Sequence, residues 1–180
     1  VDVAEPASGS AEAWRPQCPG MTFRFDLTDL RLFLNVVEAG SITAGMLQST
    51  GGSIGNVALD QSANSVTTLG SFAVSGGAFS LFNSTVLTLA GPLSATNIAI
   101  TDTAAATKAI DVTGTATASG AMTLTASNAA GGIALSGKAS AATLDIVAGN
   151  GGIAQTTGSM TATGATTLAT SGNINIAGFV

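Results

Sequence analysis

The residues of this chain that could carry chemistry are few and lie far apart. Four carboxylates, Asp60, Asp102, Asp111 and Asp145, fall within residues 46–180, at different phases of the pattern described below. Paired carboxylates can hydrolyse a glycosidic bond only when they face each other at a set separation. Nothing in this spacing pairs them. We therefore expect solvated residues on turns or faces of the fold, and we assign no catalytic residue.

Two short motifs have the spacing of known sites. Gly132–Lys138 has the glycine-to-lysine spacing of a phosphate-binding loop, but Ala139 stands where a Ser or Thr would reach Mg²⁺. Residues 139–146 are typical of a strand and a turn rather than of the required helix. Asn83–Thr85 matches an N-glycosylation acceptor, and we interpret it as a turn. Neither motif yields a cofactor-binding residue.

The composition excludes several other kinds of site. The 180 residues contain no His, a single Cys (Cys18), 5 Lys+Arg and 10 Asp+Glu, for a net charge of −5. A Ser-His-Asp triad needs a His, and the usual zinc ligand sets cannot be assembled. A lone Cys forms no intrachain disulfide, and a few scattered basic residues offer no footprint for nucleic acid. We expect no enzyme, no cofactor, no metal ligands and no DNA-binding residues.

The charged residues are concentrated near the N-terminus, and this divides the chain into three parts. Residues 1–20 hold three prolines and no apolar periodicity, so we predict a disordered segment. They also lack the basic and apolar regions of a secretory signal. No apolar run approaches the roughly 18 residues of a membrane helix. Expressed as given, the chain is expected in the cytoplasm.

Residues 21–45 form the second part and predict one short amphipathic helix. Leu30, Phe33, Leu34 and Val37 follow the i, i+3, i+4, i+7 pattern, which places them on one face. The third part, residues 46–180, is dominated by Ala, Gly, Thr and Ser and predicts a β-solenoid.

The helical segment resembles the start of LysR-type transcriptional regulators. The matching residues are Asp29, Leu30, Phe33, Val37, Gly40 and Ser41. The resemblance covers about 25 residues and implies a helix-turn-helix, but no recognition helix for the major groove follows Met46. A truncated DNA-binding regulator is therefore the alternative function. A stray amphipathic segment is the simpler interpretation of the same residues.

The solenoid prediction rests on a repeat of about 20–24 residues. One series of apolar positions contains Ile100, Leu124, Ile146 and Leu168, and a second contains Ile133, Ile153 and Ile174. A third segment type occurs at 114–120 and 159–164. Alternating residues between Gly, Asn and Ser turns predict three short strands per repeat, and so about six stacked coils. A β-sandwich is the competing fold.

The pattern also predicts which side chains face inward. We expect Ile, Leu, Val, Met and Ala inside and Thr, Ser, Asn and Asp outside. Phe72, Phe79 and Phe82 are expected to fill a wider section of the early coils.

The repeats resemble the passenger repeats of filamentous haemagglutinin-like proteins, which bacteria export by two-partner secretion. The matching stretches are Val57–Leu81, Met122–Gly137 and Leu144–Ile176. The resemblance implies a right-handed parallel β-helix at the cell surface that acts as a stalk or adhesin for a host or cell-surface ligand. The family's secretion domain and signal sequence are not seen here. Because Ala177–Val180 ends in mid-repeat without a polar cap, we expect self-association through open solenoid ends.

The two resemblances meet at Gly40–Gly45, a string that suits both a regulator turn and a solenoid strand. Recombination or misassembly at a short shared stretch would produce such a join. The hypothesis is that the chain is a chimera of two unlike pieces.

Overall fold

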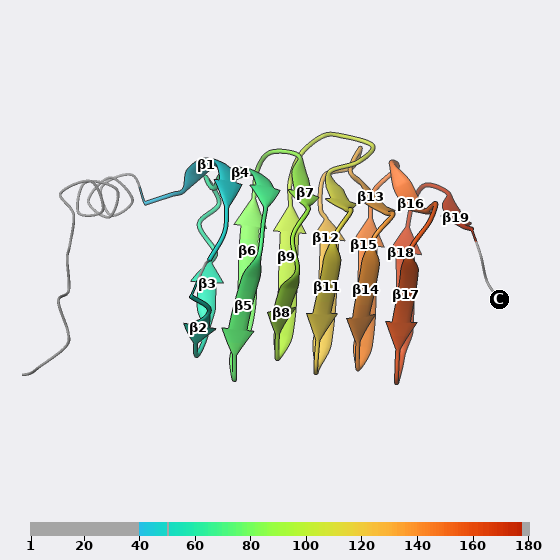
Figure 1. Ribbon diagram of the computed structural model, residues 1–180. Helices are drawn as coiled ribbons and strands as arrows, with labels where there is room; N and C mark the ends of the chain where they lie inside the picture. Colours follow the sequence, from blue (N-terminus) through green and yellow to red (C-terminus); the bar gives the residue numbers. More distant parts are fainter. Residues whose placement is uncertain (1–39, 50, 178–180) are drawn as a thin grey trace, which may run out of the picture.

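The computed structural model describes residues 40–49 and 51–177, and within these ranges the chain forms strands and turns but no helix (Figure 1). The strands lie in three sheets of seven, six and six strands. The expected disordered segment and the expected helix fall in residues 1–39, outside the described residues. No helix that could cross a bilayer occurs in the described ranges.

The three sheets are named A, B and C here, and the strands of each are given in spatial order. Sheet A contains β1 (Thr43–Leu47), β4 (Ser65–Leu69), β7 (Leu87–Leu89), β10 (Ile110–Val112), β13 (Gly132–Leu135), β16 (Gly152–Gln155) and β19 (Ile174–Ile176). Sheet B contains β2 (Ser53–Ile54), β5 (Phe72–Ser75), β8 (Leu93–Ala95), β11 (Thr115–Ala118), β14 (Lys138–Ala141) and β17 (Ser159–Ala162). Sheet C contains β3 (Val57–Leu59), β6 (Ala78–Asn83), β9 (Asn97–Asp102), β12 (Ala121–Ala126), β15 (Thr143–Ala148) and β18 (Thr166–Thr170).

The chain visits the sheets in the fixed order A, B, C, so that three successive strands make one coil. Each strand pairs in parallel with the strand three places further along the chain, for example β9 with β12 and β12 with β15. Six complete coils stack in this way, and β19 begins another. The predicted β-solenoid of about six coils is confirmed, and the β-sandwich is wrong for these residues because every pairing is parallel.

The predicted repeat positions are in register. Leu124 pairs with Ile100 on one side and Ile146 on the other, and Ile146 pairs with Leu168. In sheet A, Ile133, Ile153 and Ile174 form a second row in the same manner. The third segment type forms β11 and β17, which lie on either side of β14 in sheet B. The period read from the sequence is therefore the length of one coil.

Alternating side chains of each strand fill the interior. In β12 the inward-facing Met122 and Leu124 have no exposed surface, and the same alternation recurs in β9 and β15. Burial of one such side chain contributes about 1.5–3 kcal/mol. Phe79 is also fully buried, and the Phe72 ring packs against it at a centroid distance of 5.2 Å. These two rings occupy the early coils, as expected, but Phe82 lies on the outward face of β6 and is half-buried, so the expectation was wrong for that residue.

Glycine is required where the chain turns from sheet A into sheet B. A Cβ on Gly137 would overlap the carbonyl oxygen of Gly114 on the preceding coil, and one on Gly158 would overlap that of Gly137. Gly158 also has a φ of +72°, which side chains with a Cβ rarely adopt. Because main chain packs directly on main chain at this corner, successive coils can stack at the spacing of paired strands.

The first strand begins earlier than the predicted boundary at residue 46. β1 starts at Thr43, its Ala44 pairs with Val66, and Ile42 accepts a hydrogen bond from the main chain of Ser65. Residues 43–45, which were expected in the helical fragment, are thus part of sheet A. Their small and β-branched side chains suit a strand stacked on another coil.

Candidate functional site

The polar side chains that the fold brings together form a stack inside one corner of the solenoid. The polar column, as we name it, consists of Asn64, Asn83 and Asp102, with exposed fractions of 1%, 0% and 0%. It lies where the chain leaves sheet C for sheet A. Asn83 and Asp102 are the last residues of β6 and β9 and pair with each other. The residues were expected outside, so their burial is a correction.

Asn83 is the centre of the polar column. Its Oδ1 accepts a hydrogen bond from the Val66 main chain at 2.8 Å. Its Nδ2 shares two hydrogens among the carbonyl oxygens of Val66 and Thr85 and the Oδ2 of Asp102, the last at 2.8 Å. The amide thus replaces main-chain pairing at a corner where the strands end.

Asn64 binds the coils on both sides. Its Oδ1 accepts from the main chain of Ile42 at 2.8 Å, and its Nδ2 donates to the carbonyl oxygens of Leu59 at 2.7 Å and Phe82 at 3.2 Å. Among the described residues, every buried side-chain nitrogen or oxygen has a hydrogen-bond partner. The column therefore meets the rule that buried polar groups must be paired.

Asp102 ends the polar column as a buried acid. Its Oδ1 accepts from the main chain of Ala104 at 2.7 Å, and its Oδ2 accepts from Asn83. Burial raises the pKa of this carboxyl above its ordinary value of 3.8, and the two hydrogen bonds oppose that rise. The strands paired with β9, namely β6 and β12, carry no charged residue. Within the sheet, Asp102 has no cation to offset its burial.

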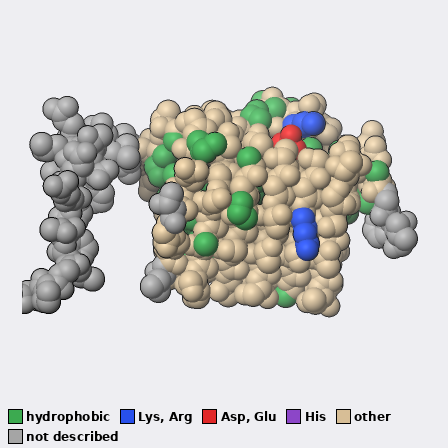
Figure 2. Space-filling model, viewed as in Figure 1, with side chains coloured by type: hydrophobic (Ala, Val, Ile, Leu, Met, Phe, Trp, Pro, Cys, Tyr) green, Lys and Arg blue, Asp and Glu red, His purple; other side chains and the backbone are tan. Residues whose placement is uncertain are grey.

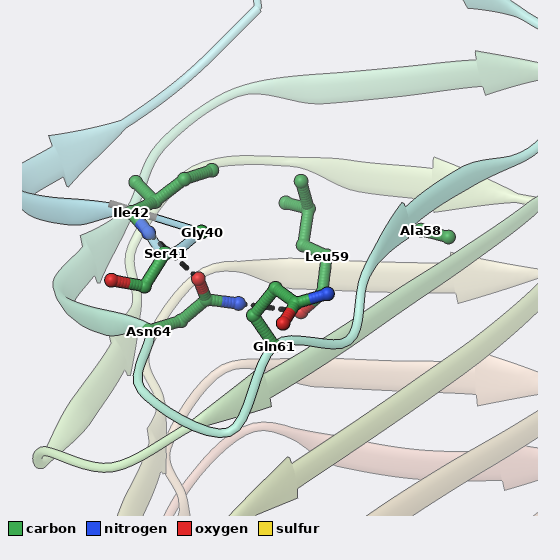
Figure 3. Close-up of a pocket in the computed structure, with 7 residues that line it drawn as sticks. All are labelled: Gly40, Ser41, Ile42, Ala58, Leu59, Gln61 and Asn64. Carbon is green, nitrogen blue, oxygen red and sulfur yellow. Dashed lines mark hydrogen bonds between the residues drawn. The ribbon is translucent and has the colours of Figure 1, made fainter. Parts of the chain in front are cut away.

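One pocket of about 300 Å³ opens beside the polar column, at the first described coil (Figure 3). It is lined by Gly40, Ser41, Ile42, Ala58, Leu59, Gln61 and Asn64. The side-chain amide of Asn64 points toward the other lining residues, but it is already hydrogen-bonded to the main chain of Ile42 and Leu59. Ser41 and Gln61 supply the remaining polar side chains of the lining. The pocket can offer a ligand a hydroxyl and an amide, but it contains no charged group.

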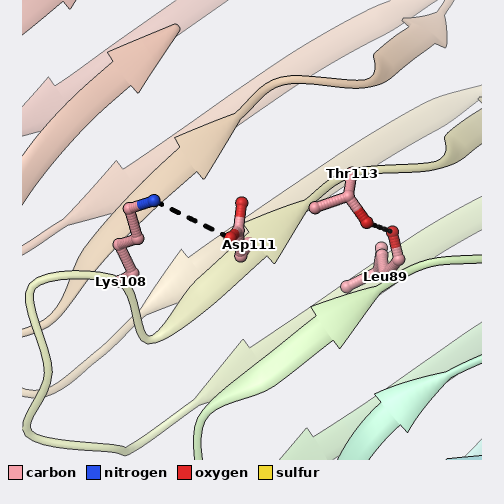
Figure 4. Close-up of polar contacts among 4 residues, drawn as sticks. All are labelled: Leu89, Lys108, Asp111 and Thr113. Carbon is pink, nitrogen blue, oxygen red and sulfur yellow. Dashed lines mark hydrogen bonds and ion pairs between the residues drawn. The ribbon is translucent and has the colours of Figure 1, made fainter. Parts of the chain in front are cut away.

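An ion pair lies on the outside of sheet A, formed by two residues that come after Asp102 in the chain (Figure 4). The Nζ of Lys108 lies 3.9 Å from a carboxylate oxygen of Asp111, and the two side chains are 66% and 24% exposed. Nearby, the Thr113 hydroxyl donates to the carbonyl oxygen of Leu89 at 3.2 Å. A solvated pair of this kind contributes little to stability or to chemistry.

The other carboxylates singled out in the sequence stay apart. Asp60 is exposed in the turn after β3, whereas Asp111 on β10 and Asp145 on β15 are half-buried on strands of different sheets. Among the described residues, no group of three His, Cys, Asp or Glu could hold a metal ion. The expectation of solvated carboxylates was wrong for Asp102 alone.

The two sequence motifs are parts of the solenoid. The glycine-to-lysine spacing spans β13, a corner and the start of β14, so its main-chain amides pair with neighbouring strands. In the glycosylation motif, Asn83 is buried and its side chain is bonded inside the polar column. Neither motif presents its groups to a ligand.

The surface between these features is largely uncharged. Figure 2 shows a face made mostly of main chain and of side chains that are neither charged nor hydrophobic, with scattered hydrophobic side chains and few charged groups. On sheet B, the outward row contains Ser94, Thr117, Ser140 and Thr161, which pair in register. We name this row the sheet B hydroxyl row.

Sequence reasoning missed the polar column because polarity alone placed Asn and Asp outside. A signal was present: Asn64, Asn83 and Asp102 recur at a constant interval of 19 residues, and each is followed by Ser or Thr. Those hydroxyls bond the column as well, since Ser84 donates to the Asn64 carbonyl and Thr103 to that of Asn83.

Comparisons with known proteins give no further identification. No protein-family model matches the chain, and searches of curated proteins and of solved structures find no match.

Proposed function

We propose that this protein is an adhesin-like structural stalk of a secreted or cell-surface repeat protein, and that it carries out no catalysis. The observation that supports the proposal best is the continuous stack of parallel coils, with apolar rows inside and small polar side chains outside. Such a stack holds its outer faces rigid and repeats them along one axis. A repetitive, uncharged face of this kind suits many weak contacts with a surface.

Two further arguments support the proposal. The resemblance to filamentous haemagglutinin-like passenger repeats covers stretches that form parts of all three sheets. Connections between parallel strands of one sheet are right-handed in the great majority of proteins, so we propose a right-handed helix. Bacterial surface localisation follows from the same resemblance.

A bead-adhesion experiment tests the function. Beads coated with the full chain are applied to animal epithelial cells and to extracellular matrix, with albumin-coated beads as the reference. The proposal expects selective retention that disappears when the coat is heat-unfolded. Retention equal to that of albumin, together with hydrolysis of a polysaccharide panel, would contradict it.

A matched pair of variants then identifies the face. Thr117→Ala with Ser140→Ala removes hydroxyls of the sheet B hydroxyl row, whereas Thr101→Ala with Thr125→Ala removes a paired row from sheet C. A binding face on sheet B predicts loss of retention for the first pair only. Equal effects would show that retention does not depend on a particular face.

We also propose that the chain associates with itself through the last described coil. Ile174 is 49% exposed, whereas Ile153 and Ile133 in the same row are 1% exposed. A further coil would cover this row and the open edge of β19. Sedimentation velocity should show concentration-dependent growth that Ile174→Lys reduces. A monomer at every concentration would contradict self-association without affecting the adhesin proposal.

The second candidate, a DNA-binding regulator fragment, rests on the sequence of residues 21–45. Binding of a duplex at low salt that weakens steeply as salt is raised would support it. Absence of binding at low salt would exclude it.

A further inference from the structure

We propose that Asn150 is a site of spontaneous deamidation, at which the folded chain converts a neutral amide into a carboxylate. Asn150 and Gly151 are the one Asn-Gly pair in the sequence. They form the middle of the turn between β15 and β16, in which the main chain of Gly152 donates to the Gly149 carbonyl at 3.1 Å. The inference is independent of the proposed function.

The two groups that must react are an exposed side chain and a main-chain nitrogen without a hydrogen-bond acceptor among the described residues. Deamidation begins when the main-chain nitrogen of the following residue attacks the side-chain carbonyl carbon of asparagine. The Asn150 side chain is exposed and has no hydrogen bond to the described residues, and the Gly151 nitrogen donates to no described carbonyl. Because Gly151 has no Cβ, nothing on that residue obstructs the approach.

The stacking of the coils requires the glycine that makes the pair reactive. A Cβ on Gly151 would lie 2.6 Å from the main-chain nitrogen of Gly132 and 2.8 Å from the Ala130 carbonyl oxygen. Asn150 itself is held by its main-chain nitrogen, which donates to the Ala129 carbonyl at 2.7 Å. Asparagine is favoured in such turns. The corner therefore combines an exposed asparagine with an obligatory glycine.

The reaction balances with water as its only other reactant. The Gly151 nitrogen forms a bond to Cγ of Asn150, loses its proton, and the side-chain nitrogen leaves as ammonia, which closes a succinimide ring. Water then opens the ring at one of its two carbonyl carbons. Opening at Cγ gives aspartate, and opening at the main-chain carbonyl gives isoaspartate. No oxidant or reductant takes part.

Isoaspartate should loosen the later coils, because it adds a carbon to the main chain inside a stacked corner. Gly172 of the next coil lies so close to Asn150 that a Cβ on it would be 2.8 Å from the Asn150 carbonyl carbon. The same corner is bonded to Ala129 on the preceding coil. A longer main chain at residue 150 cannot keep both contacts.

Peptide mapping of the full chain tests the proposal. The folded protein is incubated at mildly alkaline pH in water enriched in heavy oxygen and is then cleaved with trypsin. Cleavage after Lys108 and Lys138 yields peptide 109–138, with Asn128, and peptide 139–180, with Asn150, Asn173 and Asn175. We expect loss of the amide and gain of heavy oxygen at Asn150, with isoaspartate as one product.

The other asparagines are internal controls. Asn128 is tied by hydrogen bonds to Ala130 and Thr103, and Asn173 is exposed but precedes the β-branched Ile174. Both should keep their amides, and Asn150→Ser should remove the signal at that position. Asn150→Asp adds the charge without the extra carbon, so it should retain more thermal stability than the isoaspartate form.

Two results would overturn the proposal. The first is an intact Asn150 amide in the folded chain after a synthetic peptide of residues 146–155 has fully converted under the same conditions. The second is conversion of Asn173 as fast as that of Asn150, which would show that the Asn-Gly turn does not direct the reaction.

Discussion

The corner between sheets C and A is built in two ways along the same solenoid. In the early coils it is filled by the polar column of Asn64, Asn83 and Asp102. In the later coils, the position that pairs with Asp102 is Ala126, and Ala148 follows on β15. Both versions are closely packed, and the strand register continues through the change.

The comparison shows that coil length and corner chemistry are separable. The rows of Ile and Leu set the period and run through both halves unchanged. In the early coils, the polar column forms hydrogen bonds at the corner that leads to sheet A. In the later coils, alanine at the same corner permits close approach of main chain. Hydrogen bonds specify the early corner, and small volume specifies the later one.

The largest effect is expected from breaking the polar column at its centre. Asn83→Ala leaves the main-chain nitrogen of Val66 and the Oδ2 of Asp102 without a hydrogen-bond partner inside the fold, while Oδ1 of Asp102 keeps its bond from Ala104. Each buried group left unpaired costs about 1–3 kcal/mol, so the total loss should be roughly 3 kcal/mol or more. Urea unfolding followed by circular dichroism measures it.

The matched control is Asn97→Ala. Asn97 is an exposed residue whose side chain bonds only the Ala121 main chain among the described residues, and its loss should cost about 1 kcal/mol. If the two substitutions lower the free energy of unfolding equally, burial does not determine how much the polar column contributes to stability.

A smaller effect is expected from placing a polar side chain in the later corner. Ala148→Asn inserts extra atoms into a position that is 7% exposed. No residue of the polar column lies there to form hydrogen bonds with the new amide. Overpacking of this kind typically costs about 1–3 kcal/mol. Ala99→Asn on the exposed face of β9 should change the free energy of unfolding by less than about 0.5 kcal/mol. A neutral Ala148→Asn would mean that the two corner designs are interchangeable.

The buried carboxyl of Asp102 in the polar column should make the stability of the chain depend on pH. Because burial raises the pKa of Asp102 in the folded state, the folded chain binds its proton more tightly than the unfolded chain does. The free energy of unfolding should therefore rise as pH falls through the folded-state pKa, and this gain is absent at neutral pH.

Urea titrations of wild type and Asp102→Asn across the acidic range isolate the effect. Wild type should gain stability on acidification relative to the variant, whatever the variant's absolute stability is. Parallel pH profiles would show that the Asp102 carboxyl titrates normally in the fold.

The fold was predictable where side chains repeat by type. The series through Ile100, Leu124 and Ile146 gave the coil length, because apolar rows must align for coils to stack. Asn83 and Asp102 could not be placed by hydropathy, since an inward asparagine and an outward one look alike until their hydrogen-bond partners are known. The start of β1 at Thr43 was missed because residues 43–45 fit either a strand or a turn.

The smallest effect is expected from the ion pair on the loop that follows the polar column. Lys108→Ala removes a 3.9 Å contact with Asp111 from a side chain that is 66% exposed, so solvent already screens most of the attraction. The free energy of unfolding should change by less than about 0.5 kcal/mol, and a double-mutant cycle with Asp111→Asn should give a coupling of the same small size. Buried Asn83 and exposed Lys108 would then mark the two extremes of what a polar contact contributes in this solenoid. A coupling well above about 1 kcal/mol would instead show that the pair fixes the loop 103–109, and that the early corner is held from outside as well as from within.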